Sequence, residues 1–329
     1  MKIFVTGGGG YVGTRLVEDL LDDGFEVMVY DAFFFGNFLP FGHKNLEIVK
    51  GDLRDSELLV QSIPIGSTVI HLACISNDAS FQLNPDLSTS VNYDAFSILL
   101  EACKARNIKR FIYASTSSVY GVSDEPEITE THSLKPITLY NKYKALCEPI
   151  LLEFAKDNFE ATIFRPATVC GYSKRMRFDL SVNVLTASAL FKNRITIFGG
   201  SQLRPNLHIL DYIRLVKLLL VSDECVGEIF NAGDQNLSIL EIGNLVKDTL
   251  GGLEKKYKDI ELATEHSDDI RSYHINSDKI KNLLNFAPIF DIEHAVLEIY
   301  TAFKDNRFPL GMDNMLYHNV KTLKTNNIE

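Results

Sequence analysis

Two side chains four residues apart, Tyr140 and Lys144, are the pair in this sequence best suited to proton transfer. Side chains with this spacing lie on one face of a helix. An ordinary phenol, with a pKa of about 10, is a poor base at neutral pH, but a neighbouring ammonium favours the phenolate and lowers that pKa. The hydroxyl of Thr116 can hydrogen-bond the same substrate oxygen. The spacing also fits an ordinary amphipathic helix, so the rest of the chain decides between the two interpretations.

The first residues have the pattern of a dinucleotide-binding turn. A short apolar run leads into four glycines, and helical periodicity follows at once. In the spacing Gly7-x-x-Gly10-x-x-Gly13, Gly7 permits a sharp turn, Gly10 lets the backbone approach a pyrophosphate, and Gly13 lets the helix pack on the sheet. Asp31 ends the next predicted strand, where a carboxylate accepts hydrogen bonds from ribose hydroxyls and repels a 2′-phosphate. A glycine-rich loop without a ligand and an ordinary turn aspartate are the alternatives, but the two signals together predict NAD.

Predicted strands and helices alternate through the first half of the chain. The strands are 2–6, 25–30, 46–50, 67–73, 109–114 and 161–165, and the helices are 11–22, 91–105 and 139–158. This alternation predicts an α/β protein with a Rossmann fold, a doubly wound parallel sheet whose ligands lie at the carboxyl ends of the strands. We expect residues 1–169 and about 205–232 to form this NAD-binding domain. Residues of about 170–204 and 233–329 are expected to form a smaller, mixed α/β C-terminal substrate-binding subdomain, with a partly disordered tail after Met312.

The composition narrows the class of protein. The 329 residues carry a net charge of −10 and are 46% hydrophobic, which is typical of a globular protein without the basic surface of a nucleic-acid binder. No apolar run approaches a membrane span, and the first predicted strand leaves no room for a signal peptide. The five cysteines are scattered without metal-ligand spacing. We therefore expect a cytoplasmic protein with reduced thiols and no metal, nucleic-acid or membrane partner.

The sequence resembles, over nearly its whole length, an extended short-chain dehydrogenase/reductase of the nucleotide-sugar epimerase and dehydratase group. The matching motifs are Thr6–Gly13, Gly51–Leu53, His71–Ala73, Ser115–Gly121, Tyr140–Lys144, Arg165–Pro166, Gln202–Arg204, Asn231–Gly233 and Asp269–Arg271. The resemblance implies tightly bound NAD and a GDP- or UDP-linked sugar as the substrate. It also implies a homodimer or homotetramer paired through the helices 91–105 and 139–158.

The resemblance further implies roles for individual residues. The expected catalytic residues are Thr116, Tyr140 and Lys144. The expected cofactor-binding residues are Gly7, Gly10, Tyr11, Val12, Gly13, Asp31, Asp52, Leu53, Leu72, Ala73, Asn92, Ser115, Tyr140 and Lys144. The expected substrate-binding residues are Cys74, Ser117, Thr168, Arg175, Asn183, Arg204 and Arg271.

The implied reaction begins with oxidation of C4 of the sugar, and neighbouring residues narrow the choice of later steps. The 4,6-dehydratases of the group carry acidic residues just after the catalytic Thr, where this chain has Ser117 and Ser118, and a hydroxyl is a poor base. Enzymes that also epimerise C3 and C5 carry a Cys at the position of Ser118. We therefore expect a 4-epimerase or 4-dehydrogenase, acting in bacterial-type surface polysaccharide sugar biosynthesis. A 4,6-dehydratase, an NADPH-dependent reductase and a non-catalytic NAD-binding regulator are the alternatives.

Several stretches depart from the common epimerase pattern. Thr168 replaces the usual Asn, Cys74 is followed by an uncommon Ile-Ser-Asn-Asp sequence, and residues 173–179 are unusually basic. These departures resemble the branch that includes GDP-heptose 4-dehydrogenase. The basic residues of 173–179 are candidates for binding a diphosphate or for a solvated loop. The run 33–35, three phenylalanines, is expected to cover the adenosine or to join a subunit contact.

Overall fold

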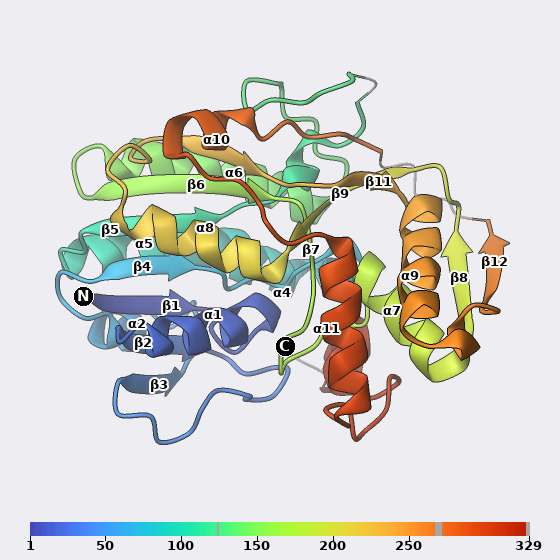
Figure 1. Ribbon diagram of the computed structural model, residues 1–329. Coiled ribbons are helices and arrows are strands. Elements are labelled where there is room, and N and C mark those ends of the chain that lie inside the picture. Colours follow the sequence, from blue (N-terminus) through green and yellow to red (C-terminus); the bar gives the residue numbers. More distant parts are fainter. Residues whose placement is uncertain (124, 267–271, 327–329) are drawn as a thin grey trace.

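A seven-stranded parallel sheet forms the centre of the protein (Figure 1). The computed structural model describes residues 1–123, 125–266 and 272–326. The strand order is β10-β6-β5-β4-β1-β2-β3. The bounds are β1 Lys2–Thr6, β2 Glu26–Asp31, β3 Leu46–Lys50, β4 Thr68–His71, β5 Arg110–Ala114, β6 Glu160–Pro166 and β10 Ile229–Ala232. The predicted doubly wound Rossmann fold is confirmed.

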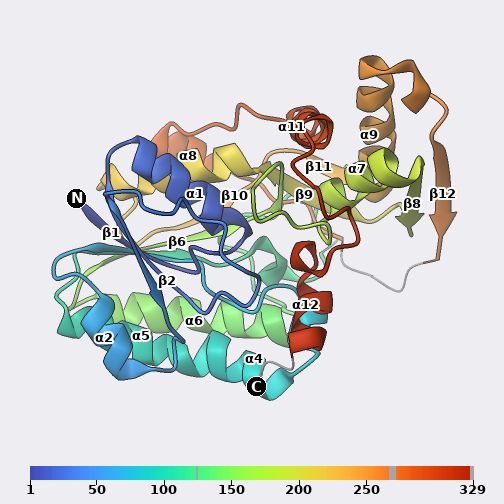
Figure 2. The ribbon, with the colours of Figure 1, turned by 90° about the horizontal axis from the view of Figure 1, so that it is seen from below.

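Helices cover both faces of this sheet (Figure 2). One face carries α1 and α8, and the other carries α2, α5 and α6. The bounds are α1 Tyr11–Asp22, α2 Ser56–Ser62, α5 Ala95–Ala105, α6 Leu139–Ala155 and α8 Ile209–Val221. Successive strand residues point to opposite faces, so in β1 the side chains of Ile3 and Val5 join the core under α1, whereas Phe4 joins the core under α5. The central strands β1, β4 and β5 are consequently buried on both faces and mostly apolar, as is typical of parallel sheets.

The predicted helix 91–105 is divided in two. A π-helical turn, η1 (Ser90–Asp94), precedes α5, and Asn92 is buried within it. Such turns are frequent at functional sites. The side chain of Asn92 accepts a hydrogen bond from the N–H of Ile75 at 2.8 Å and donates one to its carbonyl at 3.0 Å. The wider turn thereby lets one amide hold the loop that follows β4.

A smaller group of elements lies beyond the carboxyl ends of the sheet strands (Figure 1). Here α7 (Ser181–Lys192), α9 (Ile239–Leu253) and α11 (Ile292–Lys304) pack together beside the parallel pair β8 (Arg194–Phe198) and β12 (Glu261–Glu265). Three short strands, β7 (Thr168–Cys170), β9 (Leu203–His208) and β11 (Asn236–Ser238), connect this group to the sheet. The remaining elements are α3 Asp78–Phe81, α4 Pro85–Thr89, η2 Ser117–Tyr120, η3 Lys255–Tyr257, α10 Asp278–Leu284, η4 Met315–Tyr317 and α12 Asn319–Asn326.

The tail after Met312 is ordered through residue 326, so the expectation of partial disorder is wrong for this stretch. The short helix η4 and the helix α12 follow Met312, and Tyr317 and Leu323 are buried. Leu323 packs with Ile75 and Leu87 beneath the phenylalanine run. A few apolar side chains in a polar segment anchor it, which composition alone does not show. Among the described helices, none is both long and apolar enough to cross a bilayer.

Candidate active site

A cavity of about 1010 Å³ opens at the carboxyl edge of the sheet. Its walls come from the loops after β1 to β5, from α6, and from residues 166–169, 175–185, 202–204 and 312–319. Drug-sized ligands occupy pockets of roughly 300–1,000 Å³. This volume is therefore large enough for ligands bigger than a single nucleoside.

The glycine turn forms one end of the cavity and has no room for side chains. Gly7 has φ of +77°, and a Cβ on it would lie 2.5 Å from the backbone nitrogen of Ala73. A Cβ on Gly13 would lie 2.3 Å from the carbonyl oxygen of Gly7. Gly10 begins α1 with no side-chain cap on the helix N-terminus. The first N–H groups of α1 thus face the cavity as anion-binding donors, and the cradle fits the pyrophosphate of a dinucleotide.

Asp31 lies directly beside this turn. Its carboxylate accepts hydrogen bonds from the N–H of Gly9 at 2.9 Å and from the N–H of Phe33 at 2.6 Å, and its burial raises its pKa. Phe33 has a positive φ of 54°, which turns its ring against Gly9. Phe34 and Phe35 line the cavity, so of the two roles expected for this run the geometry fits the cover over the adenosine lobe.

Lys144 and Tyr140 both line the opposite end of the cavity. The ammonium of Lys144 is buried, donates to the carbonyl of Ala114 at 2.8 Å and lies 4.9 Å from the ring centroid of Tyr113. Burial, then the negative charges of Cys74 and Asp78, raise the pKa of Tyr140 well above its usual value. This differs from the lowering expected from Lys144, because desolvation of the phenolate outweighs the opposing positive charge, which comes from Arg177.

Thr116 is fixed beside this pair. Its hydroxyl shares a hydrogen bond of 2.8 Å with that of Ser118, which in turn donates to the side-chain oxygen of Asn141 at 2.6 Å. Tyr143, the other tyrosine of the same helix, stacks on Phe81 and does not line the cavity. The structure therefore places Tyr140, and not Tyr143, at the cavity.

A buried ion pair supports this end of the cavity from behind. Arg165 donates to Glu148 through Nε at 3.0 Å and through Nη2 at 2.6 Å, and both side chains are at most 4% exposed. Ser115 donates its hydroxyl to the same carboxylate at 2.5 Å. The hydroxyl of Ser115 is thus engaged away from any ligand, and only its backbone is available to a cofactor.

Most residues expected to bind ligands do line the cavity. These are Gly7, Gly10, Tyr11, Val12, Gly13, Asp31, Asp52, Leu53, Leu72, Ala73, Cys74, Ser115, Thr116, Ser117, Tyr140, Lys144, Thr168, Arg175 and Arg204. Asn92 braces the wall from outside. Arg271, with the rest of the motif Asp269–Arg271, lies outside the described residues.

Asn183 lies behind the wall rather than on it. It is fully buried, and its amide donates to the hydroxyl of Tyr11 at 3.1 Å and to the carbonyl of Arg177 at 3.1 Å. Its oxygen accepts from the N–H of Gly171 at 3.0 Å. The expected contact of Asn183 with sugar or diphosphate therefore has no support here, because the register of α7 turns this side chain towards Tyr11, whose position it fixes.

Arg175 lies at the cofactor end, not beside Arg204. Its guanidinium is 1% exposed, sits 4.3 Å from the ring centroid of Phe35 and donates to Asn319 at 2.5 Å. Burial and the charge of Arg177 lower the pKa of Arg175 to about 9, while Asp31 opposes this shift. This position differs from the expected substrate contact, because the fold of the 171–179 loop places the cation near Asp31.

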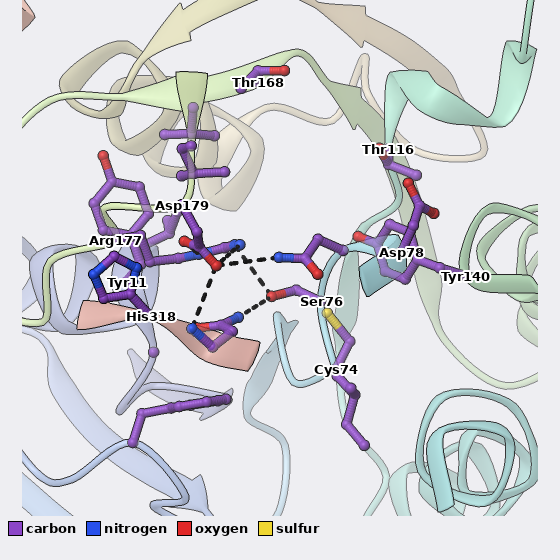
Figure 3. A pocket seen from close by; sticks show the side chains of 18 of the residues that line it. Tyr11, Cys74, Ser76, Asp78, Thr116, Tyr140, Thr168, Arg177, Asp179 and His318 are labelled. Atoms are coloured by element: carbon purple, nitrogen blue, oxygen red, sulfur yellow. Dashed lines mark hydrogen bonds and ion pairs between the residues drawn. The ribbon is translucent and has the colours of Figure 1, made fainter. Parts of the chain in front are cut away.

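Sequence reasoning missed a buried polar network in the middle of the cavity (Figure 3). Arg177 donates to Asp179 at 2.9 and 3.1 Å and to Ser76 at 3.2 Å. Asn319, in the C-terminal helix, donates to the same Ser76 hydroxyl at 2.9 Å. Although burial opposes it, the charge of Arg177 holds the pKa of Asp179 below its usual value. The unusual sequences after Cys74 and at 173–179 were signals for part of this network, whereas Asn319 had none.

Asn319→Ala is expected to release NAD about 10-fold faster than the unmodified protein. The substitution removes the hydrogen bonds that attach the C-terminal helix α12 to Arg175 and Ser76. The loss of a buried hydrogen bond costs about 1–3 kcal/mol. Gel filtration at timed intervals, with the absorbance of retained cofactor, measures the release. Thr325→Ala is the matched control, since this exposed side chain donates to the carbonyl of Lys321 within α12. Equal release from Asn319→Ala and the unmodified protein would contradict the role of the tail.

The fold and the cavity together define a class: a Rossmann-type dinucleotide-binding protein with a tyrosine and a lysine from one helix in the same cavity. The family model for the NAD dependent epimerase/dehydratase family matches residues 3–233. An uncharacterized UDP-glucose epimerase of Bacillus subtilis is 30% identical over an alignment of 305 residues, and the alignment covers 88% of this chain and 93% of that protein. The chain therefore belongs to the NAD-dependent epimerase/dehydratase family, and its cofactor is NAD.

Solved structures agree with this assignment. UDP-glucose 4-epimerase of Thermotoga maritima, solved with UDP-glucose, superposes with a TM-score of 0.83 at 26% identity, covering 93% of this chain and 99% of that one. The enzyme MoeE5 in complex with UDP-glucuronic acid and NAD superposes with a TM-score of 0.79 at 25% identity, covering 93% of this chain and 100% of that one. These relatives differ in the sugars named with them, so the family by itself leaves the substrate open.

Proposed function

We propose that the protein oxidises C4 of a nucleotide-linked sugar, as a 4-epimerase or 4-dehydrogenase in bacterial-type surface polysaccharide sugar biosynthesis. One observation carries this proposal: Thr116, Tyr140 and Lys144 meet in the same cavity as the glycine cradle. A pure NAD-binding regulator needs no such trio. Asp31, whose carboxylate accepts from Gly9 of the glycine turn and from Phe33, supports NAD over NADP and opposes an NADPH-dependent reductase.

The residues present divide the work of the proposed reaction. NAD, when bound, supplies the hydride acceptor and a positive charge that favours the phenolate. Tyr140 takes the proton of the sugar hydroxyl, and Thr116 holds the same oxygen. Lys144 donates to the carbonyl of Ala114, which fixes its ammonium at the end of β5. Because the two helical residues share one face, the proton acceptor and the ammonium stay together throughout.

One structural observation favours a second candidate function, that of a 4,6-dehydratase. Ser117 is buried and Ser118 is engaged with Asn141, so neither strand-end residue replaces the missing acids. However, Asp78 brings a carboxylate into the same part of the cavity from a different loop. A base for the elimination of water could therefore come from Asp78 instead of from the end of β5. The 4,6-dehydratase accordingly stays the second candidate function.

The proposal includes a GDP- or UDP-linked sugar whose nucleotide lies beyond the reacting end. Arg204 lines that part of the cavity with Lys192, Arg194 and Glu265. It also includes a homodimer or homotetramer paired through α5 and α6, supported by Leu139 and Leu146, which α6 exposes. We also propose that the chain is divided into a cofactor-binding domain and a substrate-binding subdomain.

The test is the absorbance of the reduced nicotinamide band when GDP- and UDP-sugars are supplied one at a time, with no NAD added. A lasting rise towards one NADH per subunit is the result expected of a 4-dehydrogenase, which keeps the hydride. An isomeric sugar without a lasting rise is the result expected of a 4-epimerase. A 4-keto-6-deoxy product would establish the dehydratase, and no change with any sugar would remove the proposal.

A further inference from the structure

We propose that Asp78 is a ligand for a sugar hydroxyl and that it selects a neutral sugar over a uronate. The inference rests on the proposed function, because it concerns the sugar end of the same cavity. Asp78 begins α3, lines the cavity and is half-buried. Figure 3 shows its carboxyl group beside Tyr140 and Thr116, across the cavity from Arg177 and Asp179.

The position of Asp78 is fixed by its neighbours. The hydroxyl of Thr138 donates to one carboxylate oxygen of Asp78. The preceding residue, Asn77, has φ of 71° and ψ of 158°, a conformation that is essentially confined to glycine. Its side chain compensates by accepting from the N–H of Ser80 at 2.8 Å and donating to Asp179 at 3.2 Å. A non-glycine residue held in this conformation indicates that the loop is constrained to present the next side chain.

The chemistry of this end favours a hydroxyl as the partner. An ionised carboxylate only accepts hydrogen bonds, and sugar hydroxyls are donors. Hydrogen bonds to an ionised group are about twice as strong as neutral ones. A uronate instead brings a second carboxylate, and like charges disfavour each other. The two cations nearest this end are already engaged, because Arg177 is paired with Asp179 and Lys144 with Ala114.

The charge of Asp78 also acts on Tyr140. The titratable groups that face Tyr140 are Cys74, Asp78, Arg177 and Tyr212, together with Tyr113 and Lys144 behind it. Asp78 raises the pKa of Tyr140, so Asp78→Asn lowers it. The base is the phenolate, so activity rises as pH passes upward through this pKa. In Asp78→Asn the rising limb of kcat/KM therefore moves to lower pH, which loss of structure does not produce.

The experiment compares Asp78→Asn with the matched control Asp86→Asn, an exposed carboxylate in the neighbouring α4. The probes are the neutral nucleotide sugar that the unmodified protein binds best and UDP-glucuronic acid. Asp78→Asn is expected to lose about 10- to 100-fold in affinity and kcat/KM for the neutral sugar, to lose no affinity for UDP-glucuronic acid, and to shift the pH limb downward. Asp86→Asn is expected to match the unmodified protein.

Three outcomes would overturn the inference. The first is unchanged affinity of Asp78→Asn for the neutral sugar, and the second is an equal loss of affinity for both probes. The third is entry of solvent deuterium at the carbon next to C4 only when Asp78 is present, which would make Asp78 an acid–base group. Calorimetric binding distinguishes failure of this inference from failure of the proposed function. A protein that binds the sugar without oxidising it would refute the proposed function. The ratio of its affinities for the neutral sugar and for UDP-glucuronic acid would still test the role of Asp78. Asp78→Ser takes the place of Asp78→Asn if circular dichroism shows that the latter is unfolded.

Discussion

Tyr140→Phe is expected to lower turnover of the nucleotide sugar by about 10²–10⁴-fold, the range that a positioned acid–base group contributes. The substitution removes one hydroxyl at the cavity wall and keeps the ring, so folding and NAD retention are expected to stay unchanged. Steady-state turnover gives the rate, and the absorbance of cofactor released on denaturation gives the NAD content.

The pH dependence adds a second criterion for the same residue. Burial raises the pKa of Tyr140, so kcat/KM of the unmodified protein is expected to rise into alkaline pH, and Tyr140→Phe is expected to lose that rise. Tyr143→Phe is the control on the same helix, because its ring stacks on Phe81 away from the cavity. Full activity of Tyr140→Phe, or equal losses in both variants, would refute the assignment of Tyr140 as the base.

Glu148→Ala is expected to lower the free energy of unfolding by about 3–5 kcal/mol, the cost of leaving one partner of a buried ion pair uncompensated. The substitution leaves the guanidinium of Arg165, which is 4% exposed, without the carboxylate that binds it through two nitrogens. Urea unfolding at constant pH, followed by circular dichroism, measures the change.

A surface carboxylate on the same helix provides the control for this prediction. Glu153→Ala is expected to change stability by less than about 1 kcal/mol, because Glu153 is exposed and, among the described residues, pairs only with the exposed Lys156. Glu148→Ala is also expected to slow turnover, since Ser115 loses the acceptor that holds it at the end of β5. If Glu148→Ala were as stable as Glu153→Ala, the buried pair would not support the site as argued.

Local sequence patterns were sufficient for the frame of this protein. The glycine spacing from Gly7 to Gly13 specifies this turn because a Cβ on either residue would lie less than 3 Å from neighbouring backbone atoms. The helix at Tyr11–Asp22 and the strand at Leu46–Lys50 have the predicted bounds, since apolar periodicity is a property of neighbouring residues. The pairing of Tyr140 with Lys144 follows from helix geometry alone.

Only the tertiary structure decided which other side chains line the cavity beside the glycine turn and the Tyr140–Lys144 pair. Asn319 meets Ser76 across 243 residues, and Arg177 meets it across 101, through hydrogen bonds that leave no periodic pattern in the sequence. The side towards which Arg175 and Asn183 point depends on the path of one loop and the register of one helix. Asp78 reaches Tyr140 because separate strands of a parallel sheet end at the same edge. Sequence periodicity thus determined the elements and the cofactor turn, whereas long-range packing determined which other side chains line the cavity.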